Sequence, residues 1–395
     1  MKTMLRCICS ILFALSMIFI SQYAYSQMNL NSMLKPYLSE YELPAVAAAV
    51  AKDGKIIAAG AAGVRKAGTN IPVTINDRFH IGSDTKAFTA LLAAMLVEEG
   101  KLTWHTTIGE VFPELLGKMD MGIRQVTLEQ LLSHTSGIPT DNEEVLSVYR
   151  EAMFQEGNLD DMRYWLVSNW VKKPLTFQSG SQFSYSNMGY TIAGAMIERK
   201  TGKTWDELIV ERIFIPLKLK TAGLGPQASL GKLDAPLGHA IIDGKIKTFL
   251  SGPNGDVPSL LGPAGSAHMS ILDFAKWAQW NAAEGKRPPH LVKPDTLKKL
   301  HTPVIDVSAK KDTPPGTPPG GKYCLGWGVT APEWAQKPLL SHGGSNGMNL
   351  AHIWVDTQQD YAMVLTTNIG GKKADEALRA IAGELYQRYA KKIKR

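Results

Sequence analysis

The sequence predicts an α+β protein: an antiparallel sheet flanked by helices, with an inserted, mainly helical subdomain. Strand-like apolar runs gather near both ends of the chain, and helical periodicity dominates between them. Residues 312–321 are too rich in proline and glycine for a helix or an inner strand, and they mark a boundary. We therefore expect the sheet in about 27–105 and 322–395, and the helical insertion in about 106–311.

The first part of the chain begins with a hairpin and continues into a helix. Residues 44–52 and 55–64 are typical of two strands, and Asp53-Gly54 between them is a strong turn signal. A short strand is expected over 78–82. A helix follows, opened by Ser83 and closed by Gly100. Its apolar residues recur at helical spacing: Phe88, Leu91, Leu92, Met95 and Leu96.

The rest of the chain separates into helical and strand-like segments. The helical pattern is found near residues 127–133, 159–171, 188–201, 205–213 and 271–283. Strand-like runs follow the proline-rich loop, over residues 326–330, 339–342, 349–355 and 361–367. An amphipathic helix over about 374–391 completes the pattern.

The N-terminus has the pattern of a secretory signal peptide. Residues 1–26 combine a basic start, an apolar stretch over 8–20 and the small-residue pattern Ala24-Tyr25-Ser26. Cleavage before Gln27 would give a periplasmic or secreted protein with no stable membrane span. An uncleaved anchor is the alternative, although the apolar stretch is short for a span.

Composition excludes several classes of protein. The 395-residue chain is 44% hydrophobic and 20% charged, which is ordinary for a globular protein. Residues 1–26 hold two of the 43 basic residues and none of the 36 acidic ones, so the remaining chain has a net charge of +5, too little to indicate nucleic-acid binding. Cys324 is the only cysteine after the signal, so no internal disulfide is expected. No zinc or nucleotide motif is present, and we expect neither a metal nor a cofactor.

One serine has the setting of a nucleophile. A serine hydroxyl needs an adjacent base, and S-x-x-K on a helix places a lysine amine one turn away. Only Ser83-Lys86 lies where a strand meets an apolar helix, with backbone amides exposed at the helix N-terminus. The alternative is a helix-capping serine beside a surface lysine. The motif also occurs three times in polar segments: Ser32-Lys35, Ser229-Lys232 and Ser308-Lys311.

Two further segments contain groups that could assist a nucleophilic serine. Tyr185-Ser186-Asn187 is the only Y-x-N, and a tyrosine hydroxyl near a lysine ammonium can become phenolate-like and act as a base. His342-Gly343-Gly344-Ser345 ends an apolar strand, where glycines let a ligand approach the backbone and an N–H can stabilise an oxyanion. The alternatives are a turn tyrosine with a capping asparagine, and a glycine-rich hairpin turn. Residues 343–347 also fit G-x-S-x-G, but no acid separates Ser345 from His352, so we set that motif aside.

The ordered set Ser83-x-x-Lys86, Tyr185-x-Asn187 and His342-x-Gly344 resembles the serine β-lactamase and penicillin-recognising family, in its class C and D-alanyl-D-alanine carboxypeptidase branch. The resemblance covers about residues 30–390. It implies an acylated Ser83, proton transfers shared by Lys86 and Tyr185, and Asn187 in contact with the substrate amide. It also implies an oxyanion hole formed by the amides of Ser83 and Ser345. Further matching phrases are residues 131–137, 183–187 and 323–327.

One departure from the family bears on the substrate. Many β-lactamases have Lys-Thr-Gly where this chain has His342-Gly343-Gly344, so a permanent charge and a hydroxyl for a substrate carboxylate are missing. The H-x-G form resembles carboxypeptidase, D-aminopeptidase and esterase relatives. We therefore expect an exported serine hydrolase that acts through an acyl-serine on small esters or on D-amino-acid-type amides and peptides.

Two alternatives stay open. One is a true β-lactamase that hydrolyses penicillins and cephalosporins. The other is a penicillin-binding sensor or cell-wall scaffold without turnover. The expected partners are small-molecule or peptide substrates, including peptidoglycan fragments or β-lactams, and not nucleic acid.

Overall fold

The computed structural model describes residues 27–250, 255–310, 312–317 and 320–390. The signal peptide predicted for residues 1–26 lies outside the described residues. Within the described part of the chain, no helix is both long enough and apolar enough to cross a membrane.

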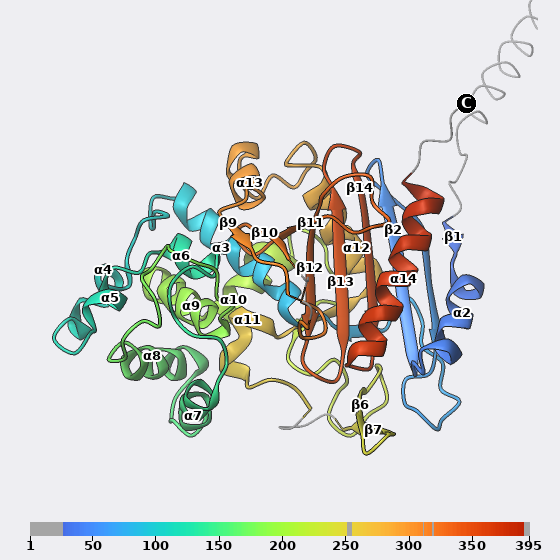
Figure 1. Cartoon of the computed structure of the whole chain (residues 1–395), viewed down its shortest axis with the longest axis horizontal. Helices are drawn as coiled ribbons and strands as arrows, with labels where there is room; N and C mark the ends of the chain where they lie inside the picture. The colour runs from blue at the N-terminus through green and yellow to red at the C-terminus, as the bar shows by residue number, and fades with distance from the viewer. Residues whose placement is uncertain (1–26, 251–254, 311, 318–319, 391–395) are drawn as a thin grey trace, which may run out of the picture.

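The two ends of the chain form one sheet (Figure 1). Its nine strands are ordered β1-β3-β2-β14-β13-β12-β11-β10-β9, and all neighbours are antiparallel except the β1–β3 pair. This confirms the predicted fold class. The strands are β1 (Met28–Asn29), β2 (Ala45–Lys52), β3 (Lys55–Gly63), β9 (Ile305–Val307), β10 (Gly321–Tyr323), β11 (Gly328–Thr330), β12 (Leu339–Ser345), β13 (Leu350–Asp356) and β14 (Tyr361–Thr367).

Helices cover both faces of this sheet. Along β2, Ala47 and Ala49 belong to the core cluster on the side of α12 (Ile271–Ala282), whereas Ala48 and Val50 belong to the cluster on the side of α14 (Lys372–Tyr389). This alternation follows from the two-residue period of a strand. Figure 1 shows α14 in front of the sheet and α12 behind it, and α2 (Asn31–Glu40) lies beside β3. The small side chains of β2 let helices pack closely on both faces.

The central part of the chain is mainly helical and packs beside the sheet, at the left of Figure 1. Its core helix is α3 (Thr85–Glu98), in which every residue from Thr85 to Leu96 is buried. The other helices are α4 (Ile108–Val111), α5 (Met121–Arg124), α6 (Leu128–Leu132), α7 (Glu143–Ala152), α8 (Leu159–Trp170), α9 (Asn187–Thr201), α10 (Trp205–Ile209), α11 (Gly262–Gly265) and α13 (Pro294–Leu300).

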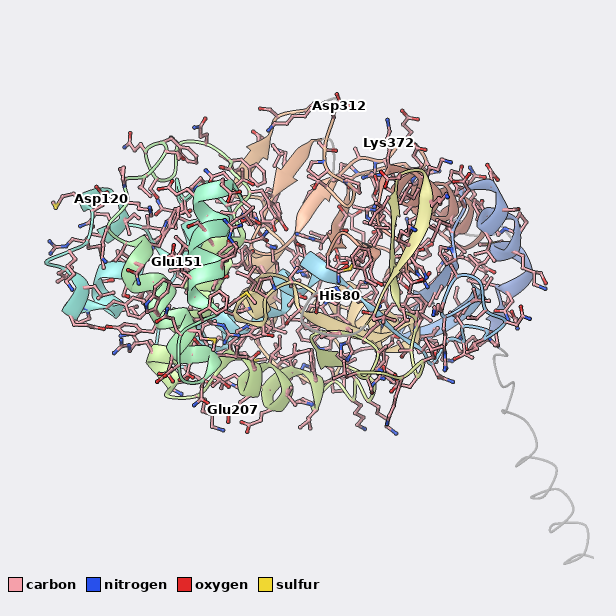
Figure 2. All side chains as sticks on the ribbon, turned by 90° about the horizontal axis from the view of Figure 1, so that it is seen from below. His80, Asp120, Glu151, Glu207, Asp312 and Lys372 are labelled. Atoms are coloured by element: carbon pink, nitrogen blue, oxygen red, sulfur yellow. The ribbon has the colours of Figure 1, made fainter. Side chains whose placement is uncertain are left out.

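Two small sheets complete the fold. β4 (Arg78–His80), β8 (Ala267–Ser270) and β5 (Gly223–Leu224) form one, and β6 (Gly238–Ile242) pairs with β7 (Lys245–Phe249) in a hairpin. β4 leads to the middle of the molecule, where His80 lies in Figure 2, while Asp120 and Glu207 lie near its rim.

Three boundaries differ from the expectations. Ser83 does not open α3, because a short 3-10 turn, η1 (Gly82–Asp84), precedes the helix. β12 runs on through Ser345 because it stays paired with β13 to that residue. The segment Ile305–Val307, expected within the helical insertion, forms the edge strand β9.

Candidate active site

Ser83 and Lys86 lie one helical turn apart, as the S-x-x-K spacing predicts, and their side chains are in contact. The distance from Lys86 Nζ to Ser83 Oγ is 3.0 Å. The same Nζ donates hydrogen bonds to Asn187 Oδ1 and to the backbone oxygen of Ala264, each at 2.7 Å. A neutral amine has two N–H groups and one lone pair. The two oxygen acceptors therefore leave the lone pair for the Ser83 hydroxyl.

The Lys86 amine is tuned toward the neutral form. Its side chain is fully buried, and desolvation lowers the pKa of Lys86 to about 7, although the nearby carboxylates of Asp141 and Asp84 oppose the shift. Both protonation states are therefore populated near neutral pH. A lysine of this kind can accept a proton from Ser83 and later return it.

Tyr185 lies beside this pair, but its ionisation differs from the expectation. Lys86 Nζ is 4.7 Å from the centre of the Tyr185 ring. Desolvation raises the pKa of Tyr185 well above its usual value, and the interaction with the Ser83 hydroxyl offsets only part of the rise. The expected phenolate-like tyrosine is therefore wrong for this state of the protein, because burial disfavours the charged ring. Tyr185 is a neutral hydroxyl that can relay a proton.

Buried His134 fixes the loop that carries Tyr185. Its Nδ1 accepts a hydrogen bond from the backbone N–H of Ser186 at 3.1 Å, and its ring packs against the Tyr185 ring at 4.2 Å. Burial lowers the pKa of His134 well below its usual value, so the ring is neutral. His134 thus holds the tyrosine loop in place.

Asn187 is held between the Lys86 amine and the Asp141 carboxylate. Its Oδ1 accepts from Lys86, and its Nδ2 donates to Asp141 Oδ2 at 2.7 Å. Asp141 Oδ1 in turn accepts from the Tyr149 hydroxyl at 3.1 Å. One N–H of Asn187 is thus engaged by Asp141, and its contact with a substrate amide stays a prediction. Sequence analysis missed Asp141, since a single aspartate in a polar loop matches no motif.

The end of β12 packs directly on the turn that carries Ser83. A Cβ on Gly344 would lie 1.9 Å from the Ile81 oxygen and 2.6 Å from the Ser83 nitrogen. A Cβ on Gly82, whose φ is +51°, would lie 2.4 Å from the Ser345 nitrogen. Only glycine permits this approach. The contact brings the Ser83 and Ser345 amides close together, as an oxyanion hole requires.

We expect Gly344→Ala to reduce kcat by about 10²–10³-fold, the usual effect of losing one oxyanion donor. The added methyl group would displace β12 from η1 because the Ile81 oxygen occupies its position. Kinetics of ester hydrolysis and a melting curve would measure the effect. Gly117→Ala is the matched control, because a Cβ there meets nothing within 4 Å. A Gly344→Ala enzyme with normal kcat would show that this contact does not support turnover.

His342 and Gly343 lie deeper than expected. His342 Nε2 is 3.0 Å from the Tyr323 hydroxyl, and its Nδ1 is 2.8 Å from the Gly343 oxygen. Burial lowers the pKa of His342 to about 3, so the ring carries no charge at neutral pH. A Cβ on Gly343 would lie 2.0 Å from the oxygen of Gly316 in the proline-rich loop. This backbone oxygen leaves no room for a threonine side chain at position 343.

Two ionic side chains of α14 anchor that part of the proline-rich loop. Gly316 N donates to Asp375 Oδ1 at 3.3 Å, and the Arg379 guanidinium donates to the Thr317 oxygen at 3.3 Å. His352 Nε2, 2.6 Å from Asp375 Oδ1, also holds the carboxylate. These contacts keep Gly316 against β12.

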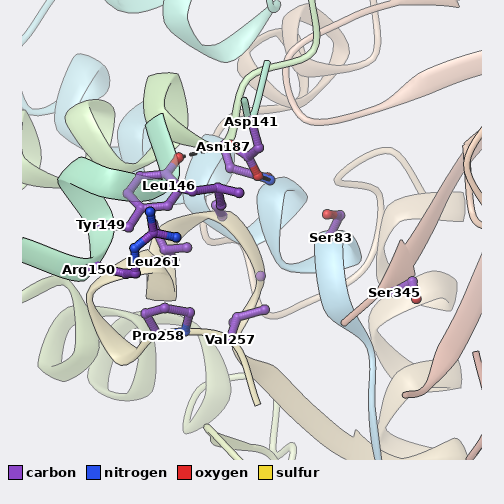
Figure 3. A pocket seen from close by; sticks show the side chains of 12 residues that line it. Ser83, Asp141, Leu146, Tyr149, Arg150, Asn187, Val257, Pro258, Leu261 and Ser345 are labelled. Atoms are coloured by element: carbon purple, nitrogen blue, oxygen red, sulfur yellow. Dashed lines mark hydrogen bonds between the residues drawn. The ribbon is translucent and has the colours of Figure 1, made fainter. Parts of the chain in front are cut away.

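Two cavities are lined by predicted site residues. The larger, of about 230 Å³, is lined at one end by Ser83, Asn187 and Ser345. Figure 3 shows that Asp141 and Asn187 point toward one another in this cavity. The smaller, of about 40 Å³, is lined by Tyr185, His342, Gly343 and residues of the proline-rich loop. The further walls of the larger cavity are mostly apolar and come from Leu146, Tyr149, Val257, Pro258, Leu261 and Ala264.

The predicted site residues therefore come together from three parts of the chain. Lys86 is buried and contacts Ser83. Ser83 and Ser345 border the larger cavity, and Tyr185 and Gly343 border the smaller one. Within the part of the chain that the structure describes, no group of three or more His, Cys, Asp or Glu side chains is placed to hold a metal ion.

Comparison with known proteins agrees with this arrangement. Residues 30–387 match the family model described as Beta-lactamase. The chain is 28% identical over 354 residues to penicillin-binding protein 4 of Amycolatopsis lactamdurans, covering 88% of this chain and 87% of the relative. It is 23% identical to protein flp of Staphylococcus aureus strain MW2, again over 88% of this chain, but it spans only 64% of that protein.

A solved structure shows the same fold. The D-amino acid amidase from Ochrobactrum anthropi SV3, determined in complex with L-phenylalanine amide, aligns with a TM-score of 0.69 at 20% identity. The alignment covers 91% of this chain and 99% of the amidase chain. With the match of the family model to nearly the whole described chain, these findings show that the protein belongs to the beta-lactamase family and is a serine hydrolase related to the beta-lactamases.

Proposed function

We propose that this protein is an exported hydrolase that forms an acyl-enzyme on Ser83 and acts on small esters or on D-amino-acid-type amides and peptides. The observation that carries the proposal is the buried Lys86 amine, 3.0 Å from Ser83 Oγ, with a pKa of about 7. In this proposal, Ser83 is the nucleophile, Lys86 the base and Tyr185 a proton relay.

Acylation begins with the neutral Lys86 amine. Ser83 Oγ attacks the substrate carbonyl carbon as its proton passes to Lys86 Nζ, and the carbonyl π electrons move to the oxygen. The resulting oxyanion receives hydrogen bonds from the Ser83 and Ser345 amides. One such donor is typically worth about 3–4 kcal/mol in the transition state.

The leaving group then needs the proton that Lys86 has accepted. The carbon–leaving-atom bond breaks, the leaving atom takes the Tyr185 hydroxyl proton, and Lys86 replaces that proton. In the second half, water attacks the acyl carbon and its proton passes to Lys86 through Tyr185. The bond between the acyl carbon and Ser83 Oγ then breaks, Oγ takes the proton from Lys86, and the acid product leaves. The raised pKa of Tyr185 suits this relay, because the ring stays protonated between transfers.

This route also orients the substrate. The leaving atom must face Tyr185, which borders the smaller cavity. The acyl part then extends into the larger, mostly apolar cavity on the other side of Ser83. An amide or ester with a compact leaving group and an apolar acyl part fits these two spaces best. The fold shared with a D-amino acid amidase agrees with such substrates.

Three substrates tested in parallel separate the proposed function from its alternatives. Wild-type protein is mixed with p-nitrophenyl acetate, D-phenylalanine amide or benzylpenicillin, while product release and intact mass are followed. Turnover of the ester or amide, with slow or trapped penicillin, supports the proposal. Rapid penicillin turnover would make the protein a β-lactamase. Stable adducts without turnover would indicate a sensor.

We expect that installing the Lys-Thr-Gly sequence by His342→Lys and Gly343→Thr will not create an efficient penicillin hydrolase. A threonine side chain at position 343 would collide with the Gly316 oxygen, and overpacking of this kind costs about 1–3 kcal/mol of stability. Penicillin turnover and melting temperature of the double variant measure both effects. The single His342→Lys variant separates the charge from the collision. A double variant that gains rapid turnover at an unchanged melting temperature would contradict this explanation.

We also propose that residues 1–26 are removed during export, which would leave the protein in the periplasm or secreted. Their basic start, apolar stretch and small-residue cleavage pattern support this proposal. The intact mass of protein recovered outside the cytoplasm identifies its N-terminal residue. A chain starting at Gln27 is the expected form.

A further inference from the structure

The larger cavity contains a carboxylate that the proposed proton transfers do not use. Asp141 lines this cavity together with Ser83, and Figure 3 shows it next to Asn187. Two hydrogen bonds fix its position, one from Asn187 Nδ2 at 2.7 Å and one from the Tyr149 hydroxyl at 3.1 Å. A carboxylate can accept about four hydrogen bonds, so two sites remain for a ligand.

The negative charge of Asp141 has no cationic side chain of its own. Among the described residues it forms no ion pair with Lys, Arg or His. Arg150, the other charged residue in the cavity wall, is paired with Glu143. Lys86 lies on the other side of Asn187 and is largely neutral above pH 7. The cavity therefore presents one unbalanced negative charge among apolar walls.

A short chain of hydrogen bonds joins Asp141 to the nucleophile. Three hydrogen bonds connect them in sequence: Ser83 to Lys86, Lys86 to Asn187, and Asn187 to Asp141. An acyl group attached to Ser83 that extends past Asn187 brings a substituent near its carbonyl carbon toward this carboxylate. Leu146 and Val257, in the same cavity wall, offer apolar surface for a side chain.

We propose that Asp141 binds the ammonium group of an acyl donor, so that the enzyme selects amides and esters of amino acids with a free amine over N-blocked ones. The inference rests on the proposed function, because it assigns the acyl part to this cavity. An ammonium group would donate to the open lone pairs of Asp141 and neutralise its charge. A charge-assisted hydrogen bond of this kind favours the charged ligand.

The test compares two ligands that differ only in that charge. D-Phenylalanine amide and N-acetyl-D-phenylalanine amide compete with p-nitrophenyl acetate at pH 7, where an α-amino group of pKa about 7.7–8.0 is mostly protonated. Competition gives an apparent affinity whether or not either amide is hydrolysed. We expect wild type to prefer the free amine by about tenfold. This is the lower end for a charged hydrogen bond, because Asp141 is open to water. The L-enantiomers are tested in the same way.

Asp141→Asn should reduce this preference to about unity, whatever it does to the absolute rate. Glu144→Gln is the matched control, since it removes the same charge from an exposed residue paired with Lys173. An unchanged preference in Asp141→Asn, or a wild type without preference, would overturn the inference while ester turnover upheld the proposed function. If wild type showed no turnover, the proposed function would fail. The affinities of the two amides for the Ser83→Ala protein, measured by titration, would then still test the inference.

Discussion

Ser83→Ala is expected to reduce ester and amide turnover by about 10⁶-fold, the effect of removing the nucleophile from other serine hydrolases. The Ser83 hydroxyl is the contact left to the Lys86 lone pair, because the other two partners of Nζ are oxygen acceptors. Its loss leaves the base without a proton to take and the carbonyl without an attacking atom. Initial rates with p-nitrophenyl acetate, and the mass of the acylated protein, measure both consequences.

Ser229→Ala is the control within the same sequence motif. Ser229 also begins an S-x-x-K, but its hydroxyl donates to Asp234 Oδ2 at 2.6 Å in an exposed loop. This variant should keep wild-type rates and acylation. Melting curves show whether each variant is folded. Ser83→Ala protein that still hydrolysed the ester at near-normal rates would place the nucleophile elsewhere.

Local patterns were sufficient for the elements that carry the site. The two strand-like runs around the Asp53-Gly54 turn predicted the β2–β3 hairpin, and the helical spacing after Ser83 predicted α3. Local context also separated Ser83-Lys86 from the three other S-x-x-K motifs. Only this pair lies where a strand meets an apolar helix, and the helix places the lysine one turn from the serine. The geometry of that pair, at 3.0 Å, agrees with the spacing argument.

Contacts between distant segments could not be predicted in the same way. Asp141 lies 46 residues before Asn187, and nothing in the loop around it signals that the two side chains meet. The Gly316 oxygen blocks a side chain at Gly343 only because α14 anchors the proline-rich loop from the end of the chain. Such positions depend on the packing of the whole sheet, which a motif does not contain.

The ionisation of Tyr185 was predicted in the wrong direction for a related reason. A nearby lysine ammonium would lower the pKa of a tyrosine, and the sequence supplied that lysine. Burial of both groups reverses the outcome, because desolvation drives Lys86 toward the neutral amine and Tyr185 toward the neutral phenol. In the proposed mechanism, Lys86 is therefore the base and Tyr185 relays the proton as a neutral hydroxyl.

This assignment predicts that Lys86→Met reduces kcat/KM by about 10²–10⁴-fold, the usual contribution of a general base. The wild-type rate should rise about tenfold per pH unit below pH 7 and level off above it, because the neutral amine of pKa about 7 is the active form. Tyr185 should add no alkaline decline in this range, since its pKa is raised.

The pH dependence separates a base from a merely structural lysine. Lys86→Met should lose the acid limb near pH 7, whereas Lys35→Met, in an S-x-x-K of the exposed helix α2, should keep both the limb and the rate. Lys86→Arg adds a second control, because a guanidinium preserves the positive charge but cannot release its proton near neutral pH. An active Lys86→Arg enzyme would mean that the positive charge, rather than the lone pair, supports catalysis. An acid limb that stayed near pH 7 in Lys86→Met would assign the titrating group to another residue.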